Sequence, residues 1–159
     1  MLDGATERVH ATAIAVRGRA VLIRGSSGSG KSDLALRILS RGPTLLFPEP
    51  ARLVADDQVD IARQGLSLSA AAPQPIFGKI EVRGVGILDI AAETAADIVL
   101  VADLVTDNQV ERLPDPWPVT TYLGLQVPVI HVAPFAASAP EKVLAALTHP
   151  ALPPLSEDR

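Results

Sequence analysis

The sequence predicts an α/β fold in which a mixed β-sheet is built around one strand–loop–helix unit. A short apolar strand (20–24) runs into a loop of small residues and then into a segment with helical periodicity (31–40). Several further runs of strand length follow, whereas only residues 139–147 repeat the helical pattern. Because 159 residues is close to the size of one domain, we expect a single domain over 1–150 and a poorly ordered, Pro-containing tail at 151–159.

The individual elements are predicted from the periodicity of apolar residues and from the residues that form turns or end helices. Residues 8–16 alternate as a strand does, and "RGRA" turns the chain into the strand at 20–24. In the helix at 31–40, Asp33 suits the first turn and Gly42 is a natural stop. Further strands are predicted at 51–57, 58–62, 66–70, 79–90 (interrupted by Gly84 and Gly86), 96–104 and 127–133, and a second helix at 139–147.

Composition excludes several classes of protein. The net charge of −4 supplies no general field for nucleic-acid backbones, so we expect no nucleic-acid partner. There are no cysteines, which removes disulfides and thiol metal sites and fits a cytoplasmic location. The most apolar run, 98–102, is too short to cross a bilayer, and we see no signal peptide. We therefore expect a cytoplasmic protein without membrane contact.

The loop after the strand at 20–24 matches the phosphate-binding pattern G-x-x-x-x-G-K-[ST] between a strand and a helix, the context that the motif requires. Small residues let successive backbone N–H groups form an anion nest, and the helix N-terminus adds about half a positive charge. The sequence thus predicts a P-loop core that binds the phosphates of a nucleotide, a pattern that ATPases, GTPases and kinases share. The predicted nucleotide-binding residues are Gly25, Ser26, Ser27, Gly28, Ser29, Gly30, Lys31 and Ser32.

An acid pair ends the apolar strand "RLVADD". Asp56 and Asp57 resemble a Walker B element, whose carboxylate faces the metal. Neighbouring strand residues point to opposite sides, so both can serve the site only at the end of the strand. One carboxylate can then face Mg²⁺ and the other an acceptor hydroxyl. By themselves His10, Glu81 and Arg83 are unremarkable strand residues.

Together, four segments make the chain resemble the catalytic domain of the HPr kinase/phosphorylase family. They are the histidine of "RVHATAIAV", "GSSGSGKSDLAL", "RLVADDQV" and, most specifically, "EVRGVGILDI". The resemblance covers residues 8–147. It implies a phosphoenolpyruvate carboxykinase-like fold, ATP and Mg²⁺ as cofactors, the phosphocarrier protein HPr as partner and a hexameric ring.

The resemblance also implies roles for individual residues. Lys31 would neutralise the transferring phosphoryl group, and Ser32 and Glu81 would hold Mg²⁺. Asp57 would take the proton of the incoming serine, with Asp56 and His10 beside it. Arg112, in "VERLPD", matches a catalytic arginine of the family, at a shorter spacing from Glu81 than the family has.

The chain departs from the family pattern in two places. An insertion over 43–50 is expected to form a surface loop. In "HVAPFA", Phe135 and Ala136 stand where the family has glycine and arginine, so we expect the phosphorolytic reverse reaction to be weak. Two alternatives to an HPr serine kinase stay open, namely a small-molecule P-loop kinase and a nucleotide-sensing module with little turnover.

Overall fold

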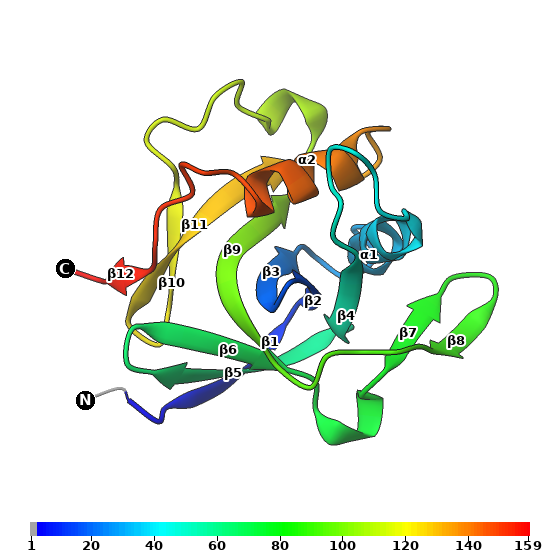
Figure 1. The fold of residues 1–159 in the computed structure, drawn as a ribbon, viewed down its shortest axis with the longest axis horizontal. Helices are drawn as coiled ribbons and strands as arrows, with labels where there is room; N and C mark the ends of the chain where they lie inside the picture. The colour runs from blue at the N-terminus through cyan, green and yellow to red at the C-terminus, as the bar shows by residue number, and fades with distance from the viewer. Residues whose placement is uncertain (1–2) are drawn as a thin grey trace.

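A strongly curved mixed sheet forms the body of the protein, and both helices pack on one of its faces (Figure 1). The computed structural model describes residues 3–159. The strands are β1 (Thr6–His10), β2 (Thr12–Val16), β3 (Arg19–Arg24), β4 (Ala51–Ala55), β5 (Gln58–Gln64), β6 (Ser67–Ala71), β7 (Lys79–Val82), β8 (Gly86–Asp89), β9 (Ala96–Leu104), β10 (Val119–Tyr122), β11 (Leu125–Val132) and β12 (Ser156–Glu157). The helices are α1 (Lys31–Ser40) and α2 (Ala139–Leu147), with 3₁₀ turns η1 (Gln74–Ile76) and η2 (Asp107–Gln109).

Three parallel strands lie at the centre of the sheet. The order is β1-β5-β6-β9-β3-β2-β4, and β11 joins β9 beyond the point where β6 leaves it. β3 and β11 both run parallel to β9, one on each side. The carboxyl ends of β3, β9 and β11 therefore meet at one edge, which is where ligands bind in open α/β sheets. β7 and β8 form a separate hairpin that projects from the body (Figure 1).

The central strands are buried on both faces. On β2 and β3, Ile14, Val21 and Ile23 pack toward the helices. The opposite faces carry Ala13, Ala15, Ala20 and Leu22, which lie in a second core. The sheet thus separates two apolar cores.

The predicted helices at 31–40 and 139–147 and the strand at 96–104 are confirmed with the same bounds. The single strand predicted over 8–16 is wrong, because the chain breaks at Ala11 between β1 and β2. β4 and β5 break beside it, and the Ala11 N–H donates to the Asp57 carbonyl at 3.2 Å. On the two sides of this break, β1 pairs with β5 and β2 pairs with β4. This pairing depends on distant residues, so the alternation of apolar and polar residues along 8–16 cannot predict it. β10 and β12 were not predicted.

The end of the chain and the insertion both lie at the surface. Within 151–159, for which the sequence predicts a poorly ordered tail, β12 pairs antiparallel with the start of β11. Residues 43–50 form an exposed loop closed by a turn in which Phe47 N donates to the Thr44 hydroxyl at 2.9 Å. Across residues 3–159, neither helix has the length and apolar character needed to cross a lipid bilayer.

An arginine–carboxylate pair fastens the central strands just before the glycine-rich loop. Arg24, the last residue of β3, donates two hydrogen bonds of 2.7 Å to the Asp103 carboxylate on β9. It donates a third to the Tyr122 hydroxyl on β10 at 3.0 Å. The bond to Asp103 is the main reason that the pKa of Arg24 lies above its usual value. Such two-point pairs fix geometry as well as adding energy, so the pair holds the strand that carries the loop.

We predict that Asp103→Asn lowers the free energy of unfolding by about 2 kcal/mol, because it leaves a half-buried guanidinium without its counter-charge. Urea denaturation followed by circular dichroism measures the loss. Asp60→Asn is the matched control, since its partner Arg8 lies on the surface and exposed ion pairs contribute little. Equal urea midpoints for the two variants would contradict this assignment.

Candidate active site

The loop between β3 and α1 adopts, at two positions, a backbone conformation that favours glycine. Gly28 has φ +79° and Gly30 has φ +104°, and both lie in the left-handed region. Ser29 N donates to the Ser26 carbonyl at 3.0 Å, and α1 begins with Leu34 N donating to the Gly30 carbonyl at 2.9 Å. The loop therefore curls tightly above the N-terminus of α1, as a phosphate cradle does.

Steric and polar details of the loop fit an anion. A Cβ added to Gly25 would lie 2.3 Å from the Ser29 hydroxyl, so only glycine fits there without a shift. That hydroxyl is buried and makes no hydrogen bond within residues 3–159. An unpaired buried donor is costly, and a bound ligand can supply the partner. The loop thus packs closely at Gly25 and has an unused hydrogen-bond donor in the Ser29 hydroxyl.

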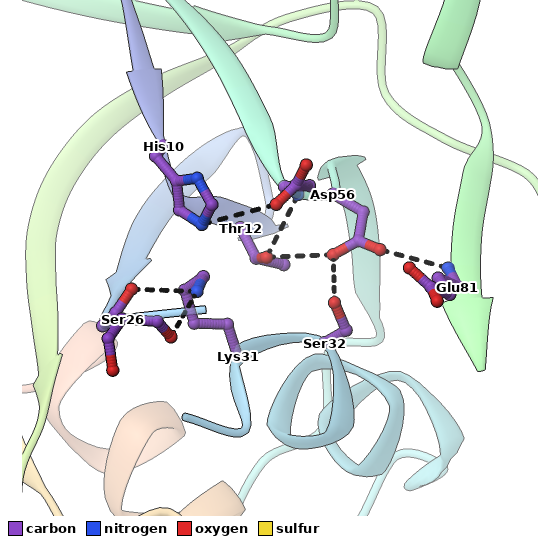
Figure 2. A network of polar contacts seen from close by, with 9 residues as sticks. His10, Thr12, Ser26, Lys31, Ser32, Asp56 and Glu81 are labelled. Atoms are coloured by element: carbon purple, nitrogen blue, oxygen red, sulfur yellow. Dashed lines mark hydrogen bonds and ion pairs between the residues drawn. The ribbon is translucent and has the colours of Figure 1, made fainter. Parts of the chain in front are cut away.

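Lys31 lies under the loop, not out in solvent. Its side chain is buried, and Nζ donates to the carbonyls of Gly25 at 2.9 Å and Ser26 at 3.0 Å (Figure 2). An ammonium group has three donors, so one remains for an anion in the cradle. The two carbonyls hold the charge in place at the mouth of the loop.

The carboxylate of Asp56 is the centre of a buried hydrogen-bond network (Figure 2). Oδ1 accepts from the hydroxyls of Ser32 at 2.6 Å and Thr12 at 2.9 Å, and Oδ2 accepts from the Glu81 backbone N–H at 3.1 Å. Asp56 is 6% exposed. A buried carboxylate needs such donors, and this one joins the P-loop helix, β2 and β7.

Asp57 points the other way and stays accessible. Its φ of +70° and the hydrogen bond from Gln58 N to the Asp56 carbonyl form a tight three-residue turn of the rare, strained type. Its Oδ1 lies 3.4 Å from Nε2 of His10, and its side chain is 64% exposed. The turn thus separates the two neighbouring carboxylates into a buried one and an open one.

A cavity of about 400 Å³ connects these groups. It is lined by Ser27, Gly28, Gly30, Lys31, Ser32, Asp33, Leu36, Asp57, Glu81, Val82, Arg83 and Phe135. No cluster of three or more metal-ligating side chains occurs within residues 3–159. Mg²⁺ at nucleotide sites is bound through one or two carboxylates besides phosphate oxygens and water, and the carboxylates of Asp56 and Glu81 beside the Ser32 hydroxyl suit that role.

Most of the predicted site residues are brought together, but Arg112 is not. The P-loop, His10, Asp56, Asp57 and Glu81 surround the cavity or its buried wall. Arg112 lines a different cavity of about 560 Å³, beside α2 and β11, together with Trp117 and His131. The segment after η2 carries it there. In this chain, therefore, Arg112 does not belong to the cluster that the sequence predicts.

Sequence reasoning missed two residues of the site. Thr12 is fully buried and links both acids, because its hydroxyl donates to Asp56 and accepts from the Asp57 N–H at 3.3 Å. A lone hydroxyl in the apolar run "ATAIAV" was the available signal. The sequence marks Phe135 only as a departure from the family pattern, yet its ring lies beside Gly30 of the P-loop. A Cβ on Gly30 would lie 3.1 Å from the Phe135 Cζ.

We predict that Thr12→Val, which keeps the shape of the side chain, destabilises the protein by about 1–3 kcal/mol because a buried carboxylate loses a donor. Chemical denaturation measures the change. Thr12→Ser is the control that retains the hydroxyl, and it should recover most of the stability. If the valine variant were as stable as the serine variant, the network would not depend on this hydrogen bond.

Comparison with known proteins identifies the family of this chain. The family described as HPr serine kinase C-terminal domain matches residues 4–146. HPr kinase/phosphorylase of Limosilactobacillus reuteri is 33% identical over 135 residues, which cover 78% of this chain and 40% of that protein. The enzyme of the same name from Clostridium perfringens is 42% identical over 85 residues, covering 54% of this chain and 25% of that protein.

The solved structures include a close match in fold. The HPr(Ser) kinase/phosphatase from Coxiella burnetii superposes with a TM-score of 0.72 at 26% identity, covering 87% of each chain. This chain spans well under half the length of the curated relatives named above and matches them in part only. The family match covers nearly the whole chain, and the chain belongs to the HPr serine kinase C-terminal domain family.

Proposed function

We propose that this protein is an ATP-dependent kinase that phosphorylates a serine of the phosphocarrier protein HPr. The observation that carries the proposal is the separation of the two acids at one P-loop. Asp56 is bonded to the P-loop hydroxyl of Ser32, whereas Asp57 is open to a second substrate beside His10. Phosphoryl transfer between two substrates needs this pair of roles, a binding site for the nucleotide and a carboxylate for the acceptor.

In this mechanism the loop amides and Lys31 bind the β- and γ-phosphates and neutralise charge as it develops. Asp57 accepts the proton of the serine hydroxyl as its oxygen attacks the γ-phosphorus in line with the leaving ADP oxygen. His10, 3.4 Å away, orients that carboxylate. Mg²⁺, held by Ser32, Asp56 and Glu81, would add positive charge at the phosphate oxygens.

The exposure of the acceptor side favours a protein substrate over a small molecule. Asp57 and His10 are each more than half exposed, so a serine on the surface of another protein can reach them. A small-molecule kinase has to exclude water around the hydroxyl group that it phosphorylates. A module that only senses nucleotides does not need an accessible carboxylate beside the P-loop. Relatives named HPr kinase/phosphorylase support HPr as that protein. A phosphoenolpyruvate carboxykinase-like fold, a hexamer and a cytoplasmic location belong to the same proposal.

We predict that Asp57→Asn lowers the rate of HPr phosphorylation by about a hundredfold or more, because an amide cannot accept the proton. Asparagine tolerates the positive φ, so the turn should survive. Phosphate transfer from radiolabelled ATP to HPr measures the rate, and calorimetry should show Mg·ATP affinity within about twofold of the wild type.

Two variants serve as controls in that assay. Lys31→Met keeps the apolar stem of the lysine, and it should abolish transfer while a cooperative thermal transition remains. Asp60→Asn changes a surface carboxylate of β5, three residues beyond Asp57, and should leave transfer unchanged. Near-normal turnover of Asp57→Asn would mean that a different group takes the proton, with Asp56 next in line.

We also predict that phosphorolysis of phosphorylated HPr is weak. In that reaction an oxygen of inorganic phosphate attacks the phosphoserine phosphorus and forms pyrophosphate. The bond to the serine oxygen breaks, and that oxygen takes up the proton that the attacking phosphate releases, which restores the serine hydroxyl. Two anions must meet, which requires cations or backbone donors. At the P-loop this chain has Phe135, a residue that is 74% exposed, followed by Ala136. A glycine and an arginine at these two positions would supply a backbone donor and a cation.

Pyrophosphate release from phosphorylated HPr and millimolar phosphate tests this prediction. We expect a rate at least tenfold below that of the forward reaction. Ala136→Arg returns a cation to the loop and should raise the reverse rate. A wild-type reverse rate equal to the forward rate would show that another part of the site binds phosphate.

A further inference from the structure

A second cavity lies against the P-loop, on the side away from the acids. Its volume is about 540 Å³, within the usual range for small-molecule sites. Ser29 of the loop forms one wall. The rest comes from the segments that follow β9 and β11, with Leu104, Val105 and Pro134 as apolar lining and Asp107 and Gln109 as polar groups. It is thus an apolar hollow with a few polar atoms, as nucleoside sites are.

The position of this cavity follows from the sheet. β4, which ends just before Asp56, and β2, whose Thr12 contacts Asp56, lie on one side of β3, and β9 and β11 lie on the other. The P-loop is at the end of β3, between them. A triphosphate in the loop with its γ-phosphate toward Asp56 therefore directs its other end to the carboxyl ends of β9 and β11, where the cavity opens.

Phe135 joins the two cavities. Its ring lines both the P-loop cavity and this second one, and 74% of the residue is exposed. Its position is held from below, because Arg37 of α1 donates to the carbonyl of Pro134 and pairs with Asp33 at 2.9 Å. The ring therefore offers a flat apolar face at the junction of the two cavities, where a planar ligand group can stack on it.

The polar side of the cavity keeps unused hydrogen-bonding capacity. The Gln109 carbonyl oxygen accepts from the N–H and hydroxyl of Thr106, which fixes the side chain and leaves its amide nitrogen without a partner in residues 3–159. Asp107 has no ion pair within the same residues. An amide donor and a carboxylate acceptor match the edge of a base and the ribose hydroxyls.

We propose that this cavity binds the nucleoside portion of ATP, with the Phe135 ring stacked on the base. The inference rests on the proposed function, since it assumes that a nucleoside triphosphate occupies the P-loop. It adds a place for the base and a residue that binds it. Stacking uses the flat face that every base has, so Phe135 contributes affinity, whereas Asp107 and Gln109 contribute selectivity.

The test compares two ligands, Mg·ATP and the magnesium complex of inorganic triphosphate, which has no nucleoside. Both dissociation constants are measured by calorimetry for the wild type, Phe135→Ala and Phe135→Trp. Phe135→Ala should weaken ATP about ten- to a hundredfold and change triphosphate by less than twofold. Phe135→Trp should keep or improve ATP binding. Phe77→Ala, which removes another partly exposed phenylalanine outside both cavities, should affect neither ligand.

Each other result has a distinct meaning. An equal loss of ATP and triphosphate in Phe135→Ala would overturn the inference, since the ring would then support the loop instead of the base. Unchanged ATP binding in that variant would also overturn it and place the base elsewhere. If wild-type protein bound triphosphate as tightly as ATP, the phosphate site would stand without a nucleoside site. If it bound neither, the proposed function itself would fail.

Discussion

The buried carboxylate of Asp56 is the interaction on which the rest of the site depends. A carboxylate that is 6% exposed is stable only with donors around it, and three different segments supply them. The donors are Thr12 of β2, Ser32 of α1 and the backbone of Glu81 in β7. Satisfying one charge therefore brings together the P-loop helix, the central sheet and the hairpin that projects from it.

The same constraint explains why the two neighbouring acids differ. With Asp56 turned inward, the chain bends sharply at Asp57 between β4 and β5, through a tight turn with a positive φ. This turn exposes the second carboxylate and places it beside His10 at the end of β1. Backbone strain at one residue thus separates a carboxylate suited to the nucleotide side from one suited to an acceptor.

The parallel strands organise the other half of the site. Because β3, β9 and β11 run in one direction, the P-loop, the segment with η2 and the loop carrying Phe135 all emerge at one edge. The pair of Arg24 and Asp103 holds two of these strands in register just before they end. The acids then flank the loop on one side and the second cavity on the other, so a nucleotide can extend across the whole edge.

The sequence by itself determined both helices, the strand at 96–104 and the composition of the loop that follows β3. Helical periodicity placed both helices, and the pattern from Gly25 to Ser32 predicted a glycine-rich loop between a strand and a helix, because both signals depend on neighbours in the chain. Only the tertiary structure decided which acid is buried, that the chain breaks at Ala11, that Arg112 lies away from the P-loop, and that Phe135 contacts it. Each of these four features depends on how a curved sheet brings distant strand ends together. The pattern of residues along the chain does not predict that curvature.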